Sequence, residues 1–280
     1  ACFNCIHFSS KTFYFWNGYR SHKRIMIKKF NNQDDLAENL ALFILTKIKG
    51  KKNFVLGCPG GRSLKKTYYY LGVLSSKLKI SLDHLIIIMM DEYVEKNNNR
   101  YQLVDSNAHY SCVRFSRKVI KKLINFKKPL KHKLKDQNIF FPTINKPSAY
   151  DQLIQKLGGI DIFLLASGSS DGHVAFNNSK TSIIKKTHII KLSDETRRDN
   201  MKTFPKFKSF SNVPKYGITV GLGTISQLTK LAIIVLSGKE KRLAVQNIIY
   251  RKTFSNKWPS TIIHKCKKKL IYVDQSALFK

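Results

Sequence analysis

The segment from residue 160 to residue 178 joins an apolar strand to side chains that can do acid–base chemistry. Residues 160–166 are almost all apolar and predict a buried strand of a parallel sheet. Small residues follow, and then Asp171, Gly172 and His173. An aspartate two residues before a histidine can hold the imidazole in one tautomer while the other ring nitrogen faces a substrate. Asp-Gly is also an ordinary turn, so a histidine without chemistry remains the alternative on these residues alone.

A glycine-rich turn follows an earlier predicted strand at residues 54–56. The turn, Gly-Cys-Pro-Gly-Gly-Arg-Ser at 57–63, leads into helical spacing at 64–71. A strand, a glycine turn and a helix start gather backbone N–H groups and the positive end of a helix dipole at one point, where a phosphate binds well. The candidate phosphate-binding residues are Gly60, Gly61, Arg62 and Ser63. Pro-Gly-Gly is equally typical of a plain turn.

Two acids follow a third apolar strand, Leu-Ile-Ile-Ile-Met-Met at 85–90. Asp91 and Glu92 are costly at the end of such a strand unless something uses or pairs them, so one of them is a candidate base. A helix cap or a surface pair is the alternative. We expect the polar segment 95–110 to be a long connection lying over the site. Lys241, at the strand-to-helix turn after residues 231–236, also suits a phosphate.

The order of apolar strands and helical segments predicts an α/β fold. With 280 residues and 42% apolar residues, the chain has ample core. We expect a single domain at 31–280, with a Rossmann-like, doubly wound, mostly parallel sheet and helices on both faces. Residues 1–30 are expected to be an N-terminal extension, with a processed leader as one interpretation. The compartment stays open, with the cytoplasm favoured, and five dispersed cysteines favour reduced thiols.

The formal net charge of +34 would ordinarily indicate a nucleic acid or an anionic membrane as partner. Only 10 of the 51 cationic residues are Arg, however, and the lysines are scattered through a chain rich in Asn, Ile, Tyr and Phe, as an A/T-rich coding bias would produce. No zinc-finger spacing or isolated basic tail accompanies them. We therefore expect no dedicated nucleic-acid binding and no membrane span. A positive field would still attract an anionic, phosphorylated small substrate.

Six segments, taken in this order, resemble motifs of the glucosamine-6-phosphate deaminase/isomerase family. They are Gly-Cys-Pro-Gly-Gly at 57–61, Met-Asp-Glu-Tyr-Val at 90–94, Gly-Gly-Ile-Asp at 158–161, Asp-Gly-His-Val-Ala-Phe-Asn at 171–177, the segment 213–224 that begins Val-Pro-Lys-Tyr, and Gly-Lys-Glu-Lys at 238–241. The resemblance covers about Asp34 to Asp274. The related 6-phosphogluconolactonases share the fold and the Asp-Gly-His, and Asp-Ser-Asn at 105–107 is more similar to their pattern.

The resemblance implies roles for individual residues. Asp91 would abstract the proton next to the substrate carbonyl, and His173, oriented by Asp171 and by a glutamate further on, would help to open the sugar ring. The phosphate would lie on the 60–63 turn with Lys241 as a point charge. The implied activity is an aldose–ketose isomerisation with release of ammonia to give fructose 6-phosphate, classed as a hydrolase. No cofactor and no metal are expected, and a homo-oligomer is compatible with it.

The chain departs from the family pattern where substrate is bound. The family's glutamate is Asn178, which cannot ionise, and a phosphate-binding arginine is Lys202, which cannot make a bidentate contact. We expect Glu92 and Asn178 to have supporting roles. His188 and Ile190 occupy the positions that match the family's allosteric basic residues. Allosteric control by an amino-sugar phosphate is therefore not expected. Three hypotheses remain: a deaminase/isomerase, a lactonase, which would tolerate Asn178 better, and a catalytically silent sugar-phosphate binder.

Overall fold

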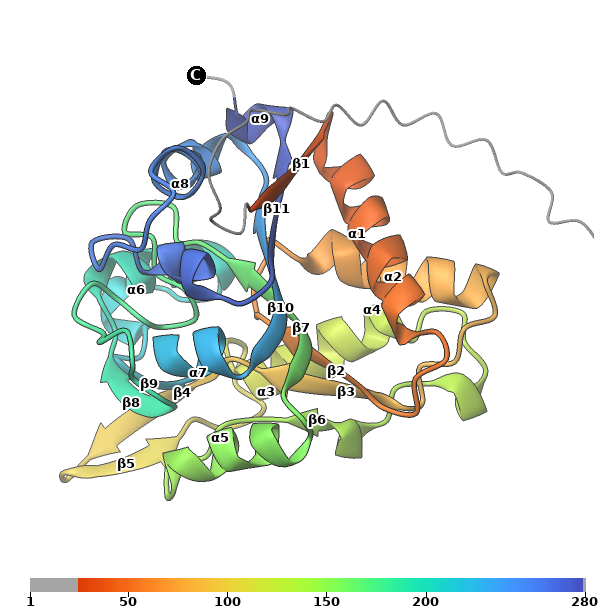
Figure 1. Ribbon diagram of the computed structural model, residues 1–280. Helices are drawn as coiled ribbons and strands as arrows, with labels where there is room; N and C mark the ends of the chain where they lie inside the picture. Colours follow the sequence, from red (N-terminus) through yellow and green to blue (C-terminus); the bar gives the residue numbers. More distant parts are fainter. Residues whose placement is uncertain (1–24, 279–280) are drawn as a thin grey trace, which may run out of the picture.

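A parallel sheet runs through the middle of residues 25–278, the part of the chain that the computed structural model describes (Figure 1). Among these residues it has seven strands, all parallel to their neighbours. In spatial order they are β1 (Met26–Phe30), β11 (Lys269–Asp274), β10 (Thr229–Leu236), β7 (Ile160–Ala166), β2 (Phe54–Cys58), β3 (Leu85–Met89) and β6 (Ile139–Phe140). The predicted Rossmann-like α/β class is confirmed.

Helices cover both faces of this sheet and create two apolar cores (Figure 1). One face packs against α1 (Gln33–Ile48), α2 (Lys65–Lys77) and α4 (Lys122–Ile124), and the other against α5 (Pro147–Lys156), α7 (Leu222–Gln227), α8 (Arg242–Val245) and α9 (Gln275–Leu278). Successive strand residues enter opposite cores, as Val55 and Leu56 do. The central strands are therefore apolar throughout rather than alternating.

The strand order reverses between β2 and β7. From β2 the chain proceeds to β3 and β6 on one side, and from β7 it proceeds to β10 and β11 on the other. In an open α/β sheet a crevice opens outside the carboxyl ends of the strands at such a switch point. The glycine turn follows β2 and the Asp-Gly-His segment follows β7, so the topology brings these two motifs to the same crevice.

A second, antiparallel sheet of four strands stands beside the first among the described residues. Its order is β5 (Arg100–Leu103), β4 (Asp91–Asn97), β9 (Tyr216–Thr219) and β8 (His188–Lys191). The prediction of a long connection at 95–110 is wrong, because β4 and β5 form a hairpin. Asn98 and Asn99 make its turn with φ angles of 45° and 62°, a conformation that asparagine tolerates.

The N-terminal boundary also differs from the expectation. Residues 26–30 form β1, which pairs with β11 along its whole length, so this part of the expected extension belongs to the main sheet. The domain boundary expected at residue 31 therefore moves to before Met26. Residues 1–24, where a processed leader was expected, lie outside the described residues. None of the helices within 25–278 combines the length and the apolar character that crossing a membrane requires.

Candidate active site

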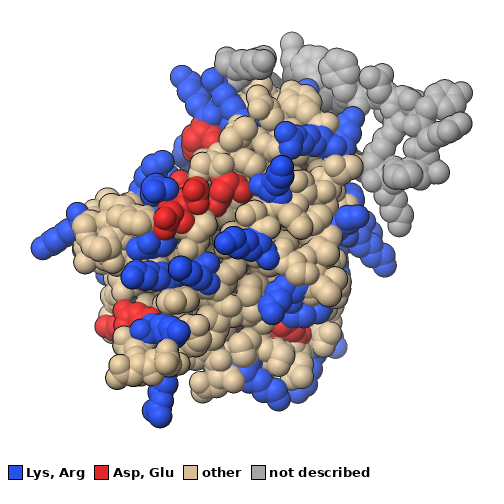
Figure 2. All heavy atoms as spheres, turned by 90° about the vertical axis from the view of Figure 1, so that its left-hand side faces the viewer, with Lys and Arg blue, Asp and Glu red and all other residues tan. Residues whose placement is uncertain are grey.

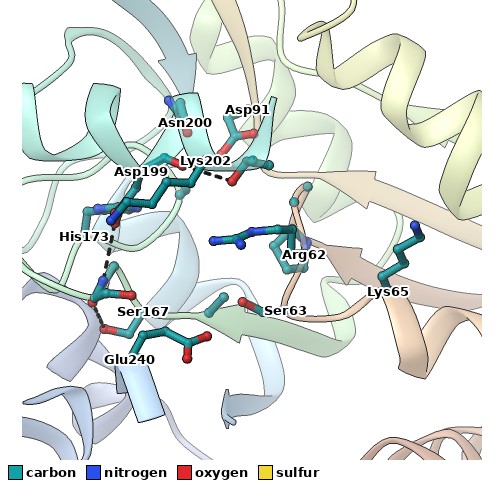
Figure 3. A pocket seen from close by; sticks show the side chains of 18 of the residues that line it. Arg62, Ser63, Lys65, Asp91, Ser167, His173, Asp199, Asn200, Lys202 and Glu240 are labelled. Atoms are coloured by element: carbon teal, nitrogen blue, oxygen red, sulfur yellow. Dashed lines mark hydrogen bonds and ion pairs between the residues drawn. The ribbon is translucent and has the colours of Figure 1, made fainter. Parts of the chain in front are cut away.

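A cavity of about 700 Å³ opens where the two sheets meet (Figure 3). Its walls come from the turn after β2, the start of β4, the segment after β7, the turn after β10 and helix α6 (Asp194–Thr203). Eight of the residues predicted from the sequence line it: Gly60, Gly61, Arg62, Ser63, Asp91, His173, Lys202 and Lys241. Gly60 and Lys241, which are 241 − 60 = 181 positions apart in the chain, thus face one space.

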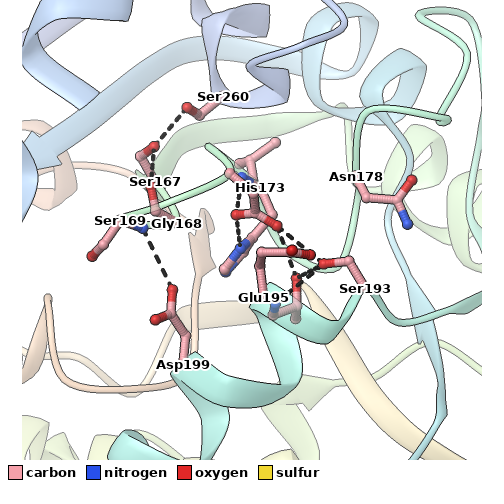
Figure 4. Close-up of polar contacts among 12 residues, drawn as sticks. Ser167, Gly168, Ser169, His173, Asn178, Ser193, Glu195, Asp199 and Ser260 are labelled. Atoms are coloured by element: carbon pink, nitrogen blue, oxygen red, sulfur yellow. Dashed lines mark hydrogen bonds and ion pairs between the residues drawn. The ribbon is translucent and has the colours of Figure 1, made fainter. Parts of the chain in front are cut away.

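The imidazole of His173, labelled in Figure 4, is held by the side chain of Asp171. The His173 Nδ1 lies 2.7 Å from Asp171 Oδ1. Burial alone would raise the pKa of Asp171, but its hydrogen bonds to His173 and the positive charge that His173 can carry outweigh burial and lower the pKa to about 2. An ionised carboxylate only accepts hydrogen bonds, so Nδ1 carries the proton and Nε2 is left for a substrate.

The loop around this pair requires glycine at residue 168. A Cβ atom placed there would lie 2.2 Å from His173 Nδ1 and 2.5 Å from Asp171 Oδ1. The Gly168 N–H also donates to the His173 carbonyl at 2.7 Å. On the far side, the Ser260 N–H donates to the Gly172 carbonyl at 2.8 Å. The backbone therefore holds the Asp171–His173 pair from two directions.

Asp91 has very different surroundings. It is the first residue of β4 and only 7% exposed. Its side chain accepts a hydrogen bond from Cys112 Sγ at 3.3 Å. Burial raises the pKa of Asp91 to about 7, and the neighbouring Glu92 adds to the rise, while Cys112 and His173 partly oppose it. A carboxylate with such a pKa can take up and release a proton near neutral pH, as a general base must.

The glycine turn presents a cationic and hydroxyl-bearing wall. Gly61 has a φ of +86°, a left-handed conformation that favours glycine. Helix α2 starts just beyond the turn, and its N-terminus has no side-chain cap. Figure 3 shows Arg62 extending from the turn into the cavity. Backbone N–H groups at a helix start, a guanidinium and the Ser63 hydroxyl are together suited to an anion such as phosphate.

Lys241 adds a buried cation to the same cavity. It is 8% exposed, and its Nζ donates to the Ser167 carbonyl at 2.7 Å and to Ser169 Oγ at 3.2 Å. Burial lowers the pKa of Lys241, whereas the nearby carboxylates of Glu240 and Asp199 oppose the fall. Two acceptors thus fix the ammonium beside the segment that carries His173.

Comparisons with known proteins agree with this geometry. A family model described as glucosamine-6-phosphate isomerases/6-phosphogluconolactonase matches residues 31–272. The chain belongs to this family. It is 30% identical over 252 residues to a glucosamine-6-phosphate deaminase of Mycoplasma mycoides subsp. mycoides, covering 89% of this chain and 94% of the relative. A glucosamine-6-phosphate isomerase of Candida albicans is 31% identical over 251 residues, covering 89% and 95%.

Solved structures from both branches of the glucosamine-6-phosphate isomerase/6-phosphogluconolactonase family have the same fold. A monomeric glucosamine-6-phosphate deaminase superposes with a TM-score of 0.76 at 26% identity, covering 90% of this chain and 98% of the other. A 6-phosphogluconolactonase from Trypanosoma cruzi has a TM-score of 0.64 at 17% identity, covering 93% and 98%. The lactonase likeness concerns the fold alone, whereas the deaminase also shares sequence.

Within this family fold, Glu92 supports a backbone segment and does not face the cavity. Among the described residues its two oxygens accept four hydrogen bonds, from the N–H groups of Tyr93, Cys112 and Val113 and from Ser111 Oγ, at 2.7–2.9 Å. Adjacent strand residues point to opposite sides, so Asp91 enters the cavity and Glu92 enters the protein. Glu92 therefore fixes the start of α3 (Cys112–Phe115).

Asn178 is not brought to the cavity. Its side chain accepts from the Lys180 N–H at 3.0 Å and donates to the Lys191 carbonyl at 3.4 Å, so it stabilises a turn. The second oxygen of Asp171 is instead bound by Ser193 Oγ at 3.0 Å, with Thr196 Oγ1 at 3.5 Å (Figure 4). Ser193 is the N-cap of α6, a role that its position before two acids indicates in the sequence, although its contact with Asp171 is tertiary.

Helix α6 also supplies cavity residues that the sequence did not single out. Asp199 Oδ2 accepts from the Ser169 N–H at 3.4 Å, and its other oxygen lies 3.8 Å from Lys202 Nζ. Asn200 lines the cavity too, and its buried Nδ2 has no hydrogen-bond partner among the described residues. The helical spacing of Asp199 and Lys202 places them on one face and could have linked them.

Proposed function

We propose that the protein converts glucosamine 6-phosphate into fructose 6-phosphate and ammonia. The observation that carries this proposal is the pairing of two proton-transfer groups in one cavity. Asp91, with a pKa of about 7, and His173, held by an ionised Asp171, both face the space bounded by the glycine turn. Membership of the family and the names of its relatives support the same activity.

The first proposed step is opening of the sugar ring. It moves a proton from the anomeric hydroxyl to the ring oxygen, and the Nε2 of His173 is suited to carry that proton. Asp171 stabilises the imidazolium that forms in between. Because Ser193 and Thr196 hold Asp171 from behind, the pair needs no carboxylate at position 178.

The second proposed step is the transfer of a proton from C2 to C1 by Asp91. The carboxylate removes the proton from C2 of the open aldehyde, and the carboxylic acid then returns it to C1. In the same conversion a proton passes from the C2 ammonium group to the carbonyl oxygen, so C1 becomes a CH2OH group and C2 an iminium. Water then adds to C2, and ammonia departs as ammonium, so the ketone forms. Burial raises the pKa of Asp91 and thereby makes it a stronger base than an exposed aspartate.

The phosphate would bind between the glycine turn and Lys241. Arg62 offers the planar, two-pronged donor that Lys202 lacks, so the guanidinium enters from the turn rather than from α6. Figure 2 shows Lys and Arg side chains spread over one face of the molecule, with Asp and Glu between them. Such a scattered positive charge favours attraction of a small anion, and the absence of dedicated nucleic-acid binding stays a prediction.

Hydrolysis of 6-phosphogluconolactone is the second candidate, and Asp-Ser-Asn at 105–107, which is more similar to the lactonase pattern, favours it. A lactonase needs a histidine that activates water and a cationic phosphate site, but it has no use for a buried carboxylate that titrates near pH 7. Asp91 therefore favours the deaminase. The expectation that the enzyme is classed as a hydrolase stays a prediction.

One experiment separates the three hypotheses. The purified protein is given glucosamine 6-phosphate, with ammonia as the readout, and 6-phosphogluconolactone, with acid release as the readout. We expect ammonia release. Acid release without ammonia would favour the lactonase. If neither product forms while both sugar phosphates raise the melting temperature, the protein is a binder and the proposed activity is refuted.

A further inference from the structure

Cys112 contacts the proposed base, although no sequence motif assigns it a function. Its Sγ lies 3.3 Å from Asp91 Oδ1, and the two residues are 4% and 7% exposed. Cys112 also lines the cavity. The other two described thiols, Cys58 and Cys266, are buried and do not line it.

The position of the thiol is fixed by the neighbour of Asp91. Glu92 Oε1 accepts the N–H of Cys112 at 2.9 Å, and its Oε2 accepts the N–H of Val113 at 2.9 Å and the hydroxyl of Ser111 at 2.8 Å. Strand β4 thus has two functions. Its first residue, Asp91, faces the cavity, and its second residue, Glu92, binds the start of α3, which carries Cys112. A displacement of α3 would move the thiol away from the carboxylate.

We propose that Cys112 is a positioning residue for Asp91, whose S–H group orients the carboxylate toward the substrate and stabilises its ionised form. The hydrogen bond occupies Oδ1 and leaves Oδ2 for the proton that is transferred. This inference rests on the proposed function, because it assigns Asp91 the part of the base. It deepens that proposal by naming a group that sets the acidity of the base.

The thiol is suited to this part because it remains a donor throughout the pH range that matters. Burial and the nearby carboxylates of Glu92 and Asp91 raise the pKa of Cys112 well above its ordinary value. It therefore keeps its proton while Asp91 titrates near pH 7. A thiolate, by contrast, would repel the carboxylate.

The titratable groups around Asp91 come from four elements. They are Glu92 and Tyr93 on β4, Cys112 on α3, His173 after β7 and Tyr150 on α5. Glu92 raises the pKa of Asp91, and His173 and Cys112 lower it. Of the two that lower it, Cys112 can be replaced without removing an acid–base group of the reaction.

The first test is the pH profile of kcat/KM for ammonia release. In Cys112→Ala the acidic limb of this profile should shift to higher pH by about half a pH unit. The value of kcat/KM should then be about threefold lower than in the wild type at pH 6 and almost unchanged at pH 9. Cys112→Ser keeps a donor and should restore most of the activity at pH 6. Cys266→Ala, a buried cysteine outside the cavity, is the matched control and should leave the limb in place. An equal loss at every pH in Cys112→Ala, or the same shift in Cys266→Ala, would overturn the proposal.

The second test does not depend on turnover. The infrared S–H stretching band of Cys112, identified by its loss in Cys112→Ala, should change position as Asp91 titrates, and the change should disappear in Asp91→Asn. A band that ignores both pH and Asp91→Asn would overturn the hydrogen bond itself. If the wild type releases no ammonia while the band responds, the proposed function fails and the pairing stands.

Discussion

Asp91 and Asp171 belong to the same site, yet their surroundings move their acidities in opposite directions. Asp91 begins β4 and has a pKa of about 7, whereas Asp171 lies in the segment after β7 and has a pKa of about 2. Burial disfavours the charged form of both. The difference comes from the donors: Asp171 is bound by the ring and backbone N–H groups of His173 and by Ser193, while Asp91 has the weak thiol of Cys112.

We propose that this contrast gives the two carboxylates different tasks. Near pH 7 Asp171 stays ionised and can only orient and stabilise the imidazole, whereas Asp91 exists in both protonation states and can exchange a proton with substrate. Pairs of titratable groups with diverging pKa values are typical of acid–base enzymes. If the contrast is correct, replacing each aspartate should have a different signature.

The largest effect should follow from Asp91→Asn. The amide has the same shape but cannot accept the C2 proton, so ammonia release should fall by about 10³-fold or more. Hydrolysis of a lactone, which involves no C2 proton, should fall far less. Steady-state rates with both substrates measure this. Asp105→Asn, at an exposed turn outside the cavity, is the control. Equal losses in both reactions would show that Asp91 has another role.

The same variant should stabilise the fold, with a pH dependence opposite to that of Asp171→Asn. Because the pKa of Asp91 is raised to about 7 in the folded state, its favourable contribution is complete below about pH 4 and is lost as the pH rises through 7. Asp91→Asn should therefore raise the free energy of unfolding at pH 8, by an amount on the order of 4 kcal/mol, and change it little at pH 4. Denaturant unfolding at the two pH values measures this.

Asp171 should show the reverse in the same experiment. Its lowered pKa means that its contribution is present above about pH 4 and is lost as the pH falls toward 2. Asp171→Asn should therefore be destabilised at pH 8 and resemble the wild type in strong acid. If both variants change stability with pH in the same direction, the contrast between the two carboxylates is wrong.

Activity should fall less in Asp171→Asn than in Asp91→Asn. His173 is still present, but an asparagine can donate to Nδ1 and so hold the wrong tautomer, which predicts a loss of about 10²-fold. Because Asp171 acts through His173, ammonia release and any lactone hydrolysis should fall together. Rates with both substrates at pH 8 test this. A selective loss of ammonia release would assign Asp171 a direct contact with C2.

The sequence predicts the site best where strongly apolar strands deliver its residues. The runs before the glycine turn, before Asp91 and before Asp171 are apolar because helices cover both faces of the sheet. Carboxyl ends of parallel strands meet at one edge, so the meeting of these motifs could be expected. The β4–β5 hairpin was missed because its outer half is short, polar and exposed, so no apolar pattern marks it.

The remaining site residues depend on tertiary docking that no local pattern encodes. Ser193 is recognisable as a helix cap, but nothing local indicates that its hydroxyl reaches Asp171, 22 positions earlier. Cys112 carries no motif, and its contact with Asp91 results from the way Glu92 binds the start of α3. Asn178 shows the opposite case. The resemblance to the family predicted a supporting role for it, but its side chain stabilises a turn and does not extend to the cavity.

Asp199 offers a third aspartate for the comparison, with the smallest expected effect, and it lines the same cavity as Asp91. It accepts the Ser169 N–H and pairs with Lys202, two donors that an incoming phosphate could use, and its negative charge repels that phosphate. Asp199→Asn keeps an acceptor for the N–H but removes the charge. We expect KM for the phosphorylated sugar to fall about threefold, with kcat unchanged and with a smaller effect at high salt.

The matched control is Asp194→Asn. Asp194 is exposed on the same helix and paired with Arg197, so this variant should leave KM unchanged. A rise of KM in Asp199→Asn would mean that the carboxylate positions Lys202 for the substrate. The different roles of the three aspartates would then depend on the side chains that they position rather than on their own charge.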